Sequence, residues 1–413
     1  MHPALWIKES KGGSLSGKRI ILGICGSIAA VKCVELAREL IRHGADVKAV
    51  MSKEAQRILH PNALHYATGN LPVLELDGAV QHVEEFGEKG QADLLLIAPC
   101  TANTIGKIAC GIDDTAVTTF ATTALGSKKP VILVPAMHES MYKNAIVAEN
   151  IRRLKEAGVA FVEPMHSECA AKFPNIWEIV LECERALGSR PLEGKQALIA
   201  SGAVQEDIDP IRVLTTRASG KTGLELAKEA YRLGAKVKII HSNFAGFSGI
   251  EEIAVRTGKE MHDTVLKELE KEKPDFFLIP AALSDFNVKK SENKISSEKP
   301  VSLELMPAKK LVEEARKHSP GLFIIGFKAE TNVSGAELVE RATKKMTKAK
   351  MQLIVANDVG KKGIGEDSNT VTIISKQGQK TVSGKKEIIA KEIWKEALKE
   401  AGLTAKTGKG LNQ

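Results

Sequence analysis

The sequence predicts an α/β protein with two doubly wound, mostly parallel sheets of the Rossmann-like or flavodoxin-like type. A βαβ pattern occurs twice, near residue 18 and again near residue 195. Further short β-branched runs then alternate with helical periodicity in both halves of the chain. The length of 413 residues is enough for two domains with a core each.

The first half opens with a strand over 17–25, an amphipathic helix over 27–44 and a second strand over 46–52. Apolar residues three and four apart predict the helix, and the short β-branched runs predict the strands. Three more strands are expected at 93–99, 130–136 and 159–164.

The second half repeats this opening, with a strand over 194–202, a helix over 222–234 and a strand over 235–242. Four more strands are expected at 275–281, 322–328, 352–358 and 369–375. The stretch 186–195 between the halves contains the Gly, Ser and Pro of a linker. We therefore expect an extension over 1–17, domains over 18–185 and 196–400, and a tail over 401–413.

Composition narrows the class of protein. No apolar run is long enough to span a membrane, and the polar first residues show no secretory signal, so we expect a cytoplasmic protein without membrane contact. None of the six cysteines forms a Cys-x-x-Cys pair, which argues against a zinc site or a disulfide framework. Cys169 differs from the others in its polar, loop-like setting.

The net charge of +8 lies entirely in the second half, where residues 191–413 carry 38 lysines and arginines against 30 acidic residues. Either this is a solvated lysine-rich surface or it serves a site for anionic ligands. Few aromatic residues are interleaved with the lysines, so a nucleic-acid surface is not expected.

Small hydroxyl-rich turns follow three strands of the first half, where ligands of a parallel sheet bind. Gly26 and Ser27 follow the first strand, CTANTIGKIACG the strand at 93–99, and MHESMY the strand at 130–136. Free backbone N–H groups at such turns can hold a phosphate, although a purely structural turn would look similar. Three of them at one sheet edge suit a planar cofactor that carries a phosphate.

The tripeptide at 220–222, Gly-Lys-Thr, looks like the end of a phosphate-binding loop. A P-loop requires a glycine five residues earlier, and Thr215 occupies that position. A nucleoside triphosphatase of the P-loop type is therefore excluded.

These stretches carry a family resemblance. GSIAAVK, QHVEEF, APCTANTIGKIACG and PAMHESMY resemble the flavin-dependent cysteine decarboxylases. SGAVQEDIDPIRVLTTRASGKTG, AALSDFNVKKSENKISSEKP, GFKAET and IVANDVG resemble the phosphopantothenate–cysteine ligases. In this order, from about residue 18 to residue 400, the sequence resembles the bifunctional enzymes of coenzyme A biosynthesis that combine both activities.

For the first domain the resemblance implies FMN, with the flavin or its phosphate at Gly26, Ser27, Ser52, Thr101, Ala102, Asn103 and Thr104. Decarboxylation of an acylated cysteine needs an electron sink, and oxidation of the thiol to a thioaldehyde by a flavin can supply it. His82 matches the family's active-site histidine, as base or orienting group. His138 stands where many relatives have Asn. Cys169 matches a cysteine of a substrate flap that is shortened here, and an inert loop thiol is the alternative.

For the second domain the resemblance implies CTP and Mg²⁺, an acyl-cytidylate of 4'-phosphopantothenate, and attack on it by cysteine. No metal ligands are predicted. Thr216 replaces an Asn that handles the acyl-cytidylate in relatives, and Ala203 and Val204 replace a Gly-Thr pair. The matching nucleotide positions are Asp285, Lys294, Ala308, Lys309, Lys310, Leu311, Phe327, Lys345 and Lys348, and the matching substrate positions are Asp209, Arg212, Thr216, Ser219, Gly220 and Lys221.

Two other functions stay open on the sequence. One is a flavin- or nicotinamide-dependent reductase of another substrate, and the other is a non-catalytic flavin-binding scaffold. The resemblance also implies a homo-oligomer, with a trimer-based decarboxylase and a dimeric ligase domain.

Overall fold

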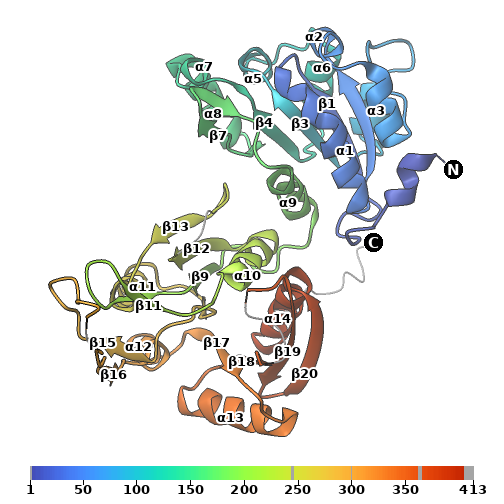
Figure 1. Ribbon diagram of the computed structural model, residues 1–413. Coiled ribbons are helices and arrows are strands. Elements are labelled where there is room, and N and C mark those ends of the chain that lie inside the picture. Colours follow the sequence, from blue (N-terminus) through green and yellow to red (C-terminus); the bar gives the residue numbers. More distant parts are fainter. Residues whose placement is uncertain (1, 243–245, 299, 361–364, 404–413) are drawn as a thin grey trace. The chain divides into compact units, whose positions relative to one another are not determined.

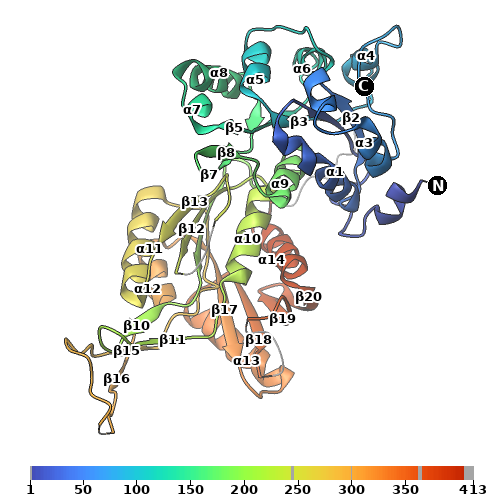
Figure 2. The same cartoon turned by 45° about the horizontal axis from the view of Figure 1, so that its top comes forward.

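The computed structural model describes residues 2–242, 246–298, 300–360 and 365–403. It divides into two compact units, Met1–Gly188 and Ser189–Gln413, which are shown in Figures 1 and 2. The expected tail beyond residue 403 lies outside the described residues.

The first unit is built on a sheet that alternates with helices along the chain. Its elements are η1 (Pro3–Ile7), β1 (Arg19–Ile24), η2 (Ile28–Lys32), α1 (Cys33–Arg42), β2 (Asp46–Met51), α2 (Lys53–Gln56), α3 (Pro61–Thr68), α4 (Gln81–Phe86), β3 (Leu94–Cys100), α5 (Ala102–Ala109), α6 (Ala116–Gly126), β4 (Val131–Pro135), β5 (Met137–His138), α7 (Glu139–Tyr142), α8 (Ala145–Glu156), β6 (Ala160–Phe161), β7 (Met165–Ser167), β8 (Ala170–Lys172) and α9 (Ile176–Leu187).

The main sheet of this unit has five parallel strands in the order β2-β1-β3-β4-β6. Alternate strand residues face two separate apolar clusters: Ile20 and Leu22 of β1 pack with α1, α3 and α9, whereas Ile21 packs on the other side with α5, α6 and α8. Burial on both faces explains why β3 and β4 are continuous apolar runs. The predicted doubly wound fold is confirmed for this unit.

Three sequence expectations need correction here. The helix expected over 27–44 begins as the 3₁₀ turn η2, whose Ile28 and Val31 are exposed, and becomes α-helical only from Cys33. The strand expected over 159–164 is paired only at β6. The linker begins later than residue 186, because Ala186 and Leu187 belong to α9 and pack against the core of the first unit.

Residues 2–17 of the expected N-terminal extension, 1–17, are packed onto the rest of the first unit and are not separate from it. Ala4 and Leu15 are buried, and Leu15 belongs to the cluster that contains α1. The backbone N–H of Leu15 also donates to the carbonyl of His43 at 2.9 Å, at the end of α1.

The second unit repeats the architecture around a larger sheet. Its elements are β9 (Gln196–Ser201), β10 (Gln205–Asp207), β11 (Val213–Thr215), α10 (Lys221–Arg232), β12 (Lys236–His241), β13 (Glu251–Ala254), α11 (Gly258–Glu272), β14 (Phe276–Leu278), β15 (Phe286–Val288), β16 (Leu305–Pro307), α12 (Leu311–His318), β17 (Phe323–Glu330), α13 (Gly335–Lys348), β18 (Leu353–Asp358), β19 (Ser368–Ser375), β20 (Gly378–Lys385) and α14 (Lys386–Glu400).

The order of the eight strands is β13-β12-β9-β14-β17-β18-β19-β20. The first six are parallel, whereas β19 and β20 form an antiparallel hairpin on the edge of β18. Helices α11, α12 and α13 cover one face. Helices α10 and α14 pack together, and the indole N–H of Trp394 in α14 donates to the carbonyl of Leu226 in α10 at 3.0 Å.

The second sheet is therefore mostly parallel, as predicted, and the strand expected at 369–375 is present as β19. Strand β20 is not among the expected elements. No helix among the described residues is long and apolar enough to cross a membrane.

Candidate functional site

Three turns of the first unit lie at the carboxyl ends of neighbouring strands, because β2, β1 and β3 are adjacent in the sheet. Ser52, Ser27 and Thr101 follow these strands, and each caps the helix that comes next with its side-chain oxygen. The cap bonds are from the N–H of Ala29 to Ser27 at 3.4 Å, of Ala55 to Ser52 at 3.2 Å and of Thr104 to Thr101 at 3.3 Å.

The turns are joined by close contacts. The hydroxyl of Thr104 donates to the sulfur of Cys25 at 3.2 Å, which connects the first turn of α5 to the end of β1. A Cβ on Gly26 would lie 2.4 Å from the Cβ of Glu54 in α2, so this turn requires glycine. The structure thus brings together the residues that sequence predicts at a flavin phosphate.

His82 lies in α4, and its ring packs edge-on against Phe120 of α6 with centroids 6.4 Å apart. Its Nδ1 atom is buried and has no hydrogen-bond partner among the described residues. A buried ring nitrogen without a partner is unfavourable unless something else binds it. No hydrogen bond between described residues joins His82 to the three capping turns.

The structure brings His138 and Cys169 close together. His138 of β5 pairs with Ala170 of β8, and the backbone N–H of Glu139 donates to the carbonyl of Cys169 at 3.0 Å. Glu168 and Cys169 form the turn between β7 and β8 with φ values of 49° and 56°, which is a left-handed conformation. This turn holds an exposed thiol beside the segment that carries His138.

The ring of His138 caps α7. Its Nδ1 lies 2.9 Å from the hydroxyl of Ser140 and accepts from the N–H of Ser140 at 3.3 Å. The next residue, Glu139, binds the ring of His166 and the ammonium of Lys143, and these contacts lower the pKa of its carboxyl.

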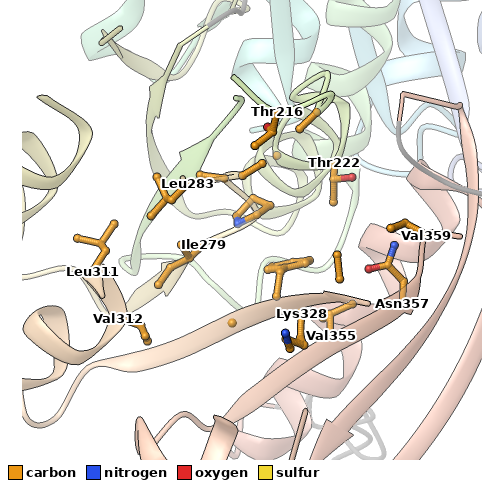
Figure 3. Close-up of a pocket in the computed structure, with 18 of the residues that line it drawn as sticks. Thr216, Thr222, Ile279, Leu283, Leu311, Val312, Lys328, Val355, Asn357 and Val359 are labelled. Carbon is orange, nitrogen blue, oxygen red and sulfur yellow. The ribbon is translucent and has the colours of Figure 1, made fainter. Parts of the chain in front are cut away.

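A cavity of about 770 Å³ lies in the second unit at the carboxyl ends of its parallel strands. The loop before α10, the segment after β14, the starts of α12 and α14, and parts of β17, β18 and α13 line it. Figure 3 shows Thr216 and Thr222 from the α10 side and Lys328, Val355 and Asn357 from the strand side. This is where an open α/β sheet binds ligands.

Most of the nucleotide and substrate positions predicted from the sequence line this cavity. They are Asp285, Lys309, Lys310, Leu311, Phe327, Lys345, Lys348, Thr216, Ser219, Gly220 and Lys221. Ala308 does not line it but lies beside it, because its N–H donates to the carbonyl of Asp285 at 2.9 Å.

One wall of the cavity consists of the start of α12 and the end of α13 and carries Lys309, Lys310, Lys345 and Lys348. Polar contacts hold this wall in place. The ammonium of Lys310 pairs with the carboxylate of Asp285 at 2.5 Å and lowers the pKa of that carboxyl. The ammonium of Lys345 donates to the carbonyl of Phe327 at 3.0 Å. Burial lowers the pKa of Lys345, and the neighbouring Lys328 adds to the effect.

The Gly-Lys-Thr-Gly stretch at 220–223 has a packing function that explains its glycines. Gly220 caps α10 with φ at 74°. A Cβ on Gly223 would lie 2.0 Å from the hydroxyl oxygen of Ser201 at the end of β9. Lys221 pairs with Asp367 at 2.6 Å. The stretch therefore begins a helix that packs tightly against a strand end, and does not form a P-loop.

Asp209, Arg212 and Lys294 do not line the cavity among the described residues. Asp209 is buried and accepts from the N–H groups of Ile211 and Arg212, both at 2.8 Å, and from that of Ile295 at 3.2 Å. These backbone donors outweigh burial and lower the pKa of Asp209. The guanidinium of Arg212 donates to the carbonyl of Ile295 at 3.0 Å. Asp209 and Arg212 thus anchor the loop that carries the exposed Lys294 through the backbone of Ile295.

Several lining residues are absent from the sequence prediction. Asn357 stands in the stretch IVANDVG and Lys328 in GFKAET, so the resemblance could have identified both. Lys386 carries no such signal, because it is one lysine in a lysine-rich half. Among the described residues, no three His, Cys, Asp or Glu side chains gather as a metal site.

Both units of the chain match family models of flavoproteins. The family model named Flavoprotein matches residues 8–187, and the model named DNA/pantothenate metabolism flavoprotein C-terminal domain matches residues 192–400. The coenzyme A biosynthesis bifunctional protein CoaBC of Thermococcus kodakarensis is 46% identical over 400 residues, which cover 96% of this chain and 98% of the relative. That of Methanocaldococcus jannaschii is 38% identical, over 95% and 96% of the two chains.

The chain belongs to the family of CoaBC bifunctional proteins of coenzyme A biosynthesis. It is thus a bifunctional enzyme that ligates phosphopantothenate with cysteine and decarboxylates the product. The family membership confirms the resemblance to the bifunctional enzymes of coenzyme A biosynthesis and favours it over the reductase and scaffold alternatives. A crystal structure of the FMN-dependent cysteine decarboxylase SpaF is 28% identical, covers 42% of this chain and 97% of its own, and has a TM-score of 0.37.

Proposed function

We propose that the first domain binds FMN and decarboxylates 4'-phosphopantothenoylcysteine, and that the second forms this compound from 4'-phosphopantothenate and cysteine with CTP and Mg²⁺. The observation that carries the proposal is the convergence of separately predicted residues. The capping turns at Ser27, Ser52 and Thr101 follow adjacent strands, and most of the predicted nucleotide positions, though not Lys294 and Ala308, line one cavity.

The residues of the first domain suit a flavin phosphate. The turn at Gly26 requires glycine because a Cβ would meet Glu54, and the backbone N–H groups of this turn are of the kind that can bind an anion. In this proposal Gly26, Ser27, Ser52 and the turn of Thr101, Ala102, Asn103 and Thr104 hold the FMN. When bound there, FMN supplies the two-electron chemistry that decarboxylation of an acylated cysteine requires.

Three side chains would act on the substrate. His82 has a buried Nδ1 without a hydrogen-bond partner in the described part of the chain, which leaves that atom for a proton or hydrogen bond of a bound molecule. His138 would bind the substrate carboxylate. Cys169 would deliver a proton to the enethiol intermediate, and the exposed turn of Glu168 and Cys169 leaves its thiol accessible.

In the second domain we assign the cationic wall of α12 and α13 to CTP. Lys310 pairs with Asp285, and Lys345 donates to a backbone carbonyl. Lys309 and Lys348, which pair with Glu314 and Glu313, add cationic groups that suit phosphates. Thr216, Ser219, Gly220 and Lys221 would hold the phosphopantothenate and its acyl-cytidylate. Lys294 would offset charge that develops on the phosphates, with its loop fixed by Asp209 and Arg212.

We also propose that the enzyme is a homo-oligomer, with a trimer-based first domain and a dimeric second domain. Exposed apolar side chains stand directly beside the predicted flavin turn: Ile28 is 77% exposed and Val31 is 54% exposed. Apolar groups in such a position often mark a subunit interface. Light scattering on the purified protein measures its oligomeric state, and a monomer would contradict this part of the proposal.

One reconstitution tests the whole assignment. Purified protein is incubated with phosphopantothenate, cysteine, CTP and Mg²⁺, and phosphopantothenoylcysteine, phosphopantetheine and CO₂ are measured. Omission of CTP, its replacement by ATP, chelation of Mg²⁺ and removal of the flavin are run in parallel. We expect ligation to require CTP and Mg²⁺ and CO₂ release to require the flavin. Ligation at full rate without CTP, or CO₂ release by flavin-free protein, would overturn the corresponding half.

A further inference from the structure

The hairpin of β7 and β8 carries Cys169 at its turn and is attached to the first unit through short strands. Strands β7 and β8 have three residues each, and β8 pairs with the two residues of β5. The backbone bond from the N–H of Glu139 to the carbonyl of Cys169 also joins the turn to α7. Figure 2 shows α7, β5, β8 and β7 next to one another. A hairpin this short is marginally stable by itself, so its position depends on side-chain contacts.

A side-chain contact joins α7 to β7 across the central strand β8. The ring nitrogen Nδ1 of His166 in β7 lies 2.9 Å from a carboxylate oxygen of Glu139, the first residue of α7. The strand register explains how the two meet. His166 and Met137 both lie opposite Ala171 of β8, and side chains at opposite positions share one face of a sheet. Glu139 comes two residues after Met137 and contacts His166 on that face.

Tyr142 of α7 adds a second point of contact with β7. Its phenol donates to the carboxylate of Glu163, two residues before β7, at 2.6 Å. The ring of Tyr142 also packs edge-on against the ring of His166, with centroids 5.4 Å apart. Glu163 is held from α8 as well, by the ammonium of Lys155 at 2.7 Å. Because Glu139 and Tyr142 are three residues apart on α7, this helix holds both the approach to β7 and its middle residue.

We propose that Glu139 and His166 form a latch that holds the hairpin of β7 and β8 against α7 and so positions the thiol of Cys169 for the decarboxylase reaction. Both are positioning residues, since they act through Cys169. The inference rests on the proposed role of Cys169, whose S–H bond breaks while a C–H bond forms on the enethiol intermediate. Decarboxylation precedes this proton transfer. Loss of the latch should therefore slow the formation of phosphopantetheine and leave the release of CO₂ unchanged.

Two substitutions of His166 separate its hydrogen bond from its ring. His166→Phe keeps an aromatic ring beside Tyr142 but has no N–H group, whereas the amide of His166→Asn can still donate to Glu139. Glu139→Met removes the carboxylate and keeps a side chain of similar length. Lys143→Gln is the matched control, because Lys143 pairs with the other oxygen of the Glu139 carboxylate, at 3.0 Å, and does not contact the hairpin through that bond.

The full-length, flavin-loaded variants react with phosphopantothenoylcysteine in a single turnover, and CO₂ and phosphopantetheine are timed separately. The His166 side chain is 49% exposed, so its ion pair is partly screened. His166→Phe and Glu139→Met should slow phosphopantetheine formation by roughly two- to five-fold and release CO₂ at the wild-type rate. The double variant should be no slower than either single variant. His166→Asn and Lys143→Gln should behave as the wild type.

Three results would overturn the latch. One is phosphopantetheine formation at the wild-type rate in His166→Phe. Another is an equal loss of CO₂ release in that variant, which would indicate a general defect of the site. The third is a loss in His166→Asn as large as in His166→Phe, because the ring and not the hydrogen bond would then be responsible.

Backbone hydrogen exchange provides a readout that does not depend on the reaction. Loss of the latch should speed exchange at residues 165–172 in His166→Phe but not in Lys143→Gln, because local opening of the hairpin becomes easier. If Cys169→Ser makes phosphopantetheine normally, the proposed role of Cys169 fails, and exchange alone decides on the latch. Faster exchange confined to the hairpin would then support the latch, and unchanged exchange in His166→Phe would overturn it.

Discussion

The carboxylate of Asp209 accepts a hydrogen bond from the backbone N–H of Ile295 at 3.2 Å and so fixes the residue that follows Lys294. The carboxylate is buried and also binds the two N–H groups of its own turn. Arg212 holds the same loop through the carbonyl of Ile295. Asp209 is therefore expected to act by positioning Lys294.

We predict that Asp209→Asn lowers the ligation rate in the same direction as Lys294→Gln. Loss of an electrostatic group of this kind costs about 3 kcal/mol, or on the order of 100-fold in rate. The double variant should be little slower than Lys294→Gln alone, because both substitutions remove the same function, that of the Lys294 ammonium. The ligation rates of the wild type, the single variants and the double variant are compared in a steady-state assay. Lys290→Gln is the control, since Lys290 pairs with Asp207. Additive losses would show that Asp209 acts independently of Lys294.

His82→Asn should abolish CO₂ release and leave ligation intact, because the two chemistries belong to separate domains. Both activities are measured on the same preparation with phosphopantothenoylcysteine and with the ligase substrates. His60→Asn is a suitable control: His60 is exposed and caps α3, and Asn is an equally good cap. A parallel decline of both activities in His82→Asn would contradict the division between the domains.

Cys169→Ser should release CO₂ but stall before phosphopantetheine, because a serine hydroxyl is a far weaker acid than a thiol. The turn itself should persist, since its contact to Glu139 uses the backbone carbonyl of residue 169. CO₂ and phosphopantetheine are quantified together in a single turnover. Cys110→Ser, which changes another exposed thiol of the same unit, should behave as the wild type. A normal yield of phosphopantetheine from Cys169→Ser would make Cys169 an inert loop thiol.

Thr216 should anchor the acyl-cytidylate through its hydroxyl, which can donate and accept hydrogen bonds. Thr216→Val should slow the capture of cysteine and let the acyl-cytidylate accumulate, and Thr216→Asn should match or exceed the wild-type rate. Rapid quench detects the intermediate. Thr215→Val is the control, because the hydroxyl of Thr215 faces away to the carbonyl of Val204 and does not line the cavity. Normal turnover of Thr216→Val without accumulation would remove Thr216 from the site.

The parallel core strands could be predicted from the sequence because each is a continuous apolar run between turn residues. Strand β20 could not, since the stretch GQKTVSGK is polar and has glycine at its start and near its end. It is a strand only because β19 offers hydrogen-bond partners along its whole length. The start of the first helix could not be predicted either. Ile28 and Val31 continue the apolar pattern of the helix, yet both are exposed to solvent.

For the sites, the family resemblance identified eleven of the residues that line the cavity, whereas the residue pattern alone identified only the three hydroxyl-rich turns of the first unit. The resemblance placed Lys294 with the nucleotide positions. The loop that carries Lys294 is anchored on Asp209, and neither residue is in the described lining of the cavity. Lys386 was not predictable, because its burial in the cavity lining depends on tertiary contacts. Whether a lysine is solvated or buried is decided by what packs around it.

The hairpin of β19 and β20 covers the edge of β18, where an unpaired strand would favour aggregation. Without it, β18 would end the sheet, and its apolar run Leu-Ile-Val-Ala would offer unpaired backbone groups to other chains. The edge strand β20 is mostly exposed and carries lysines at both ends of its polar stretch, which discourages edge-to-edge pairing. A chain that is cut before residue 366, by a protease or a premature stop codon, would therefore tend to aggregate rather than persist as a shorter enzyme.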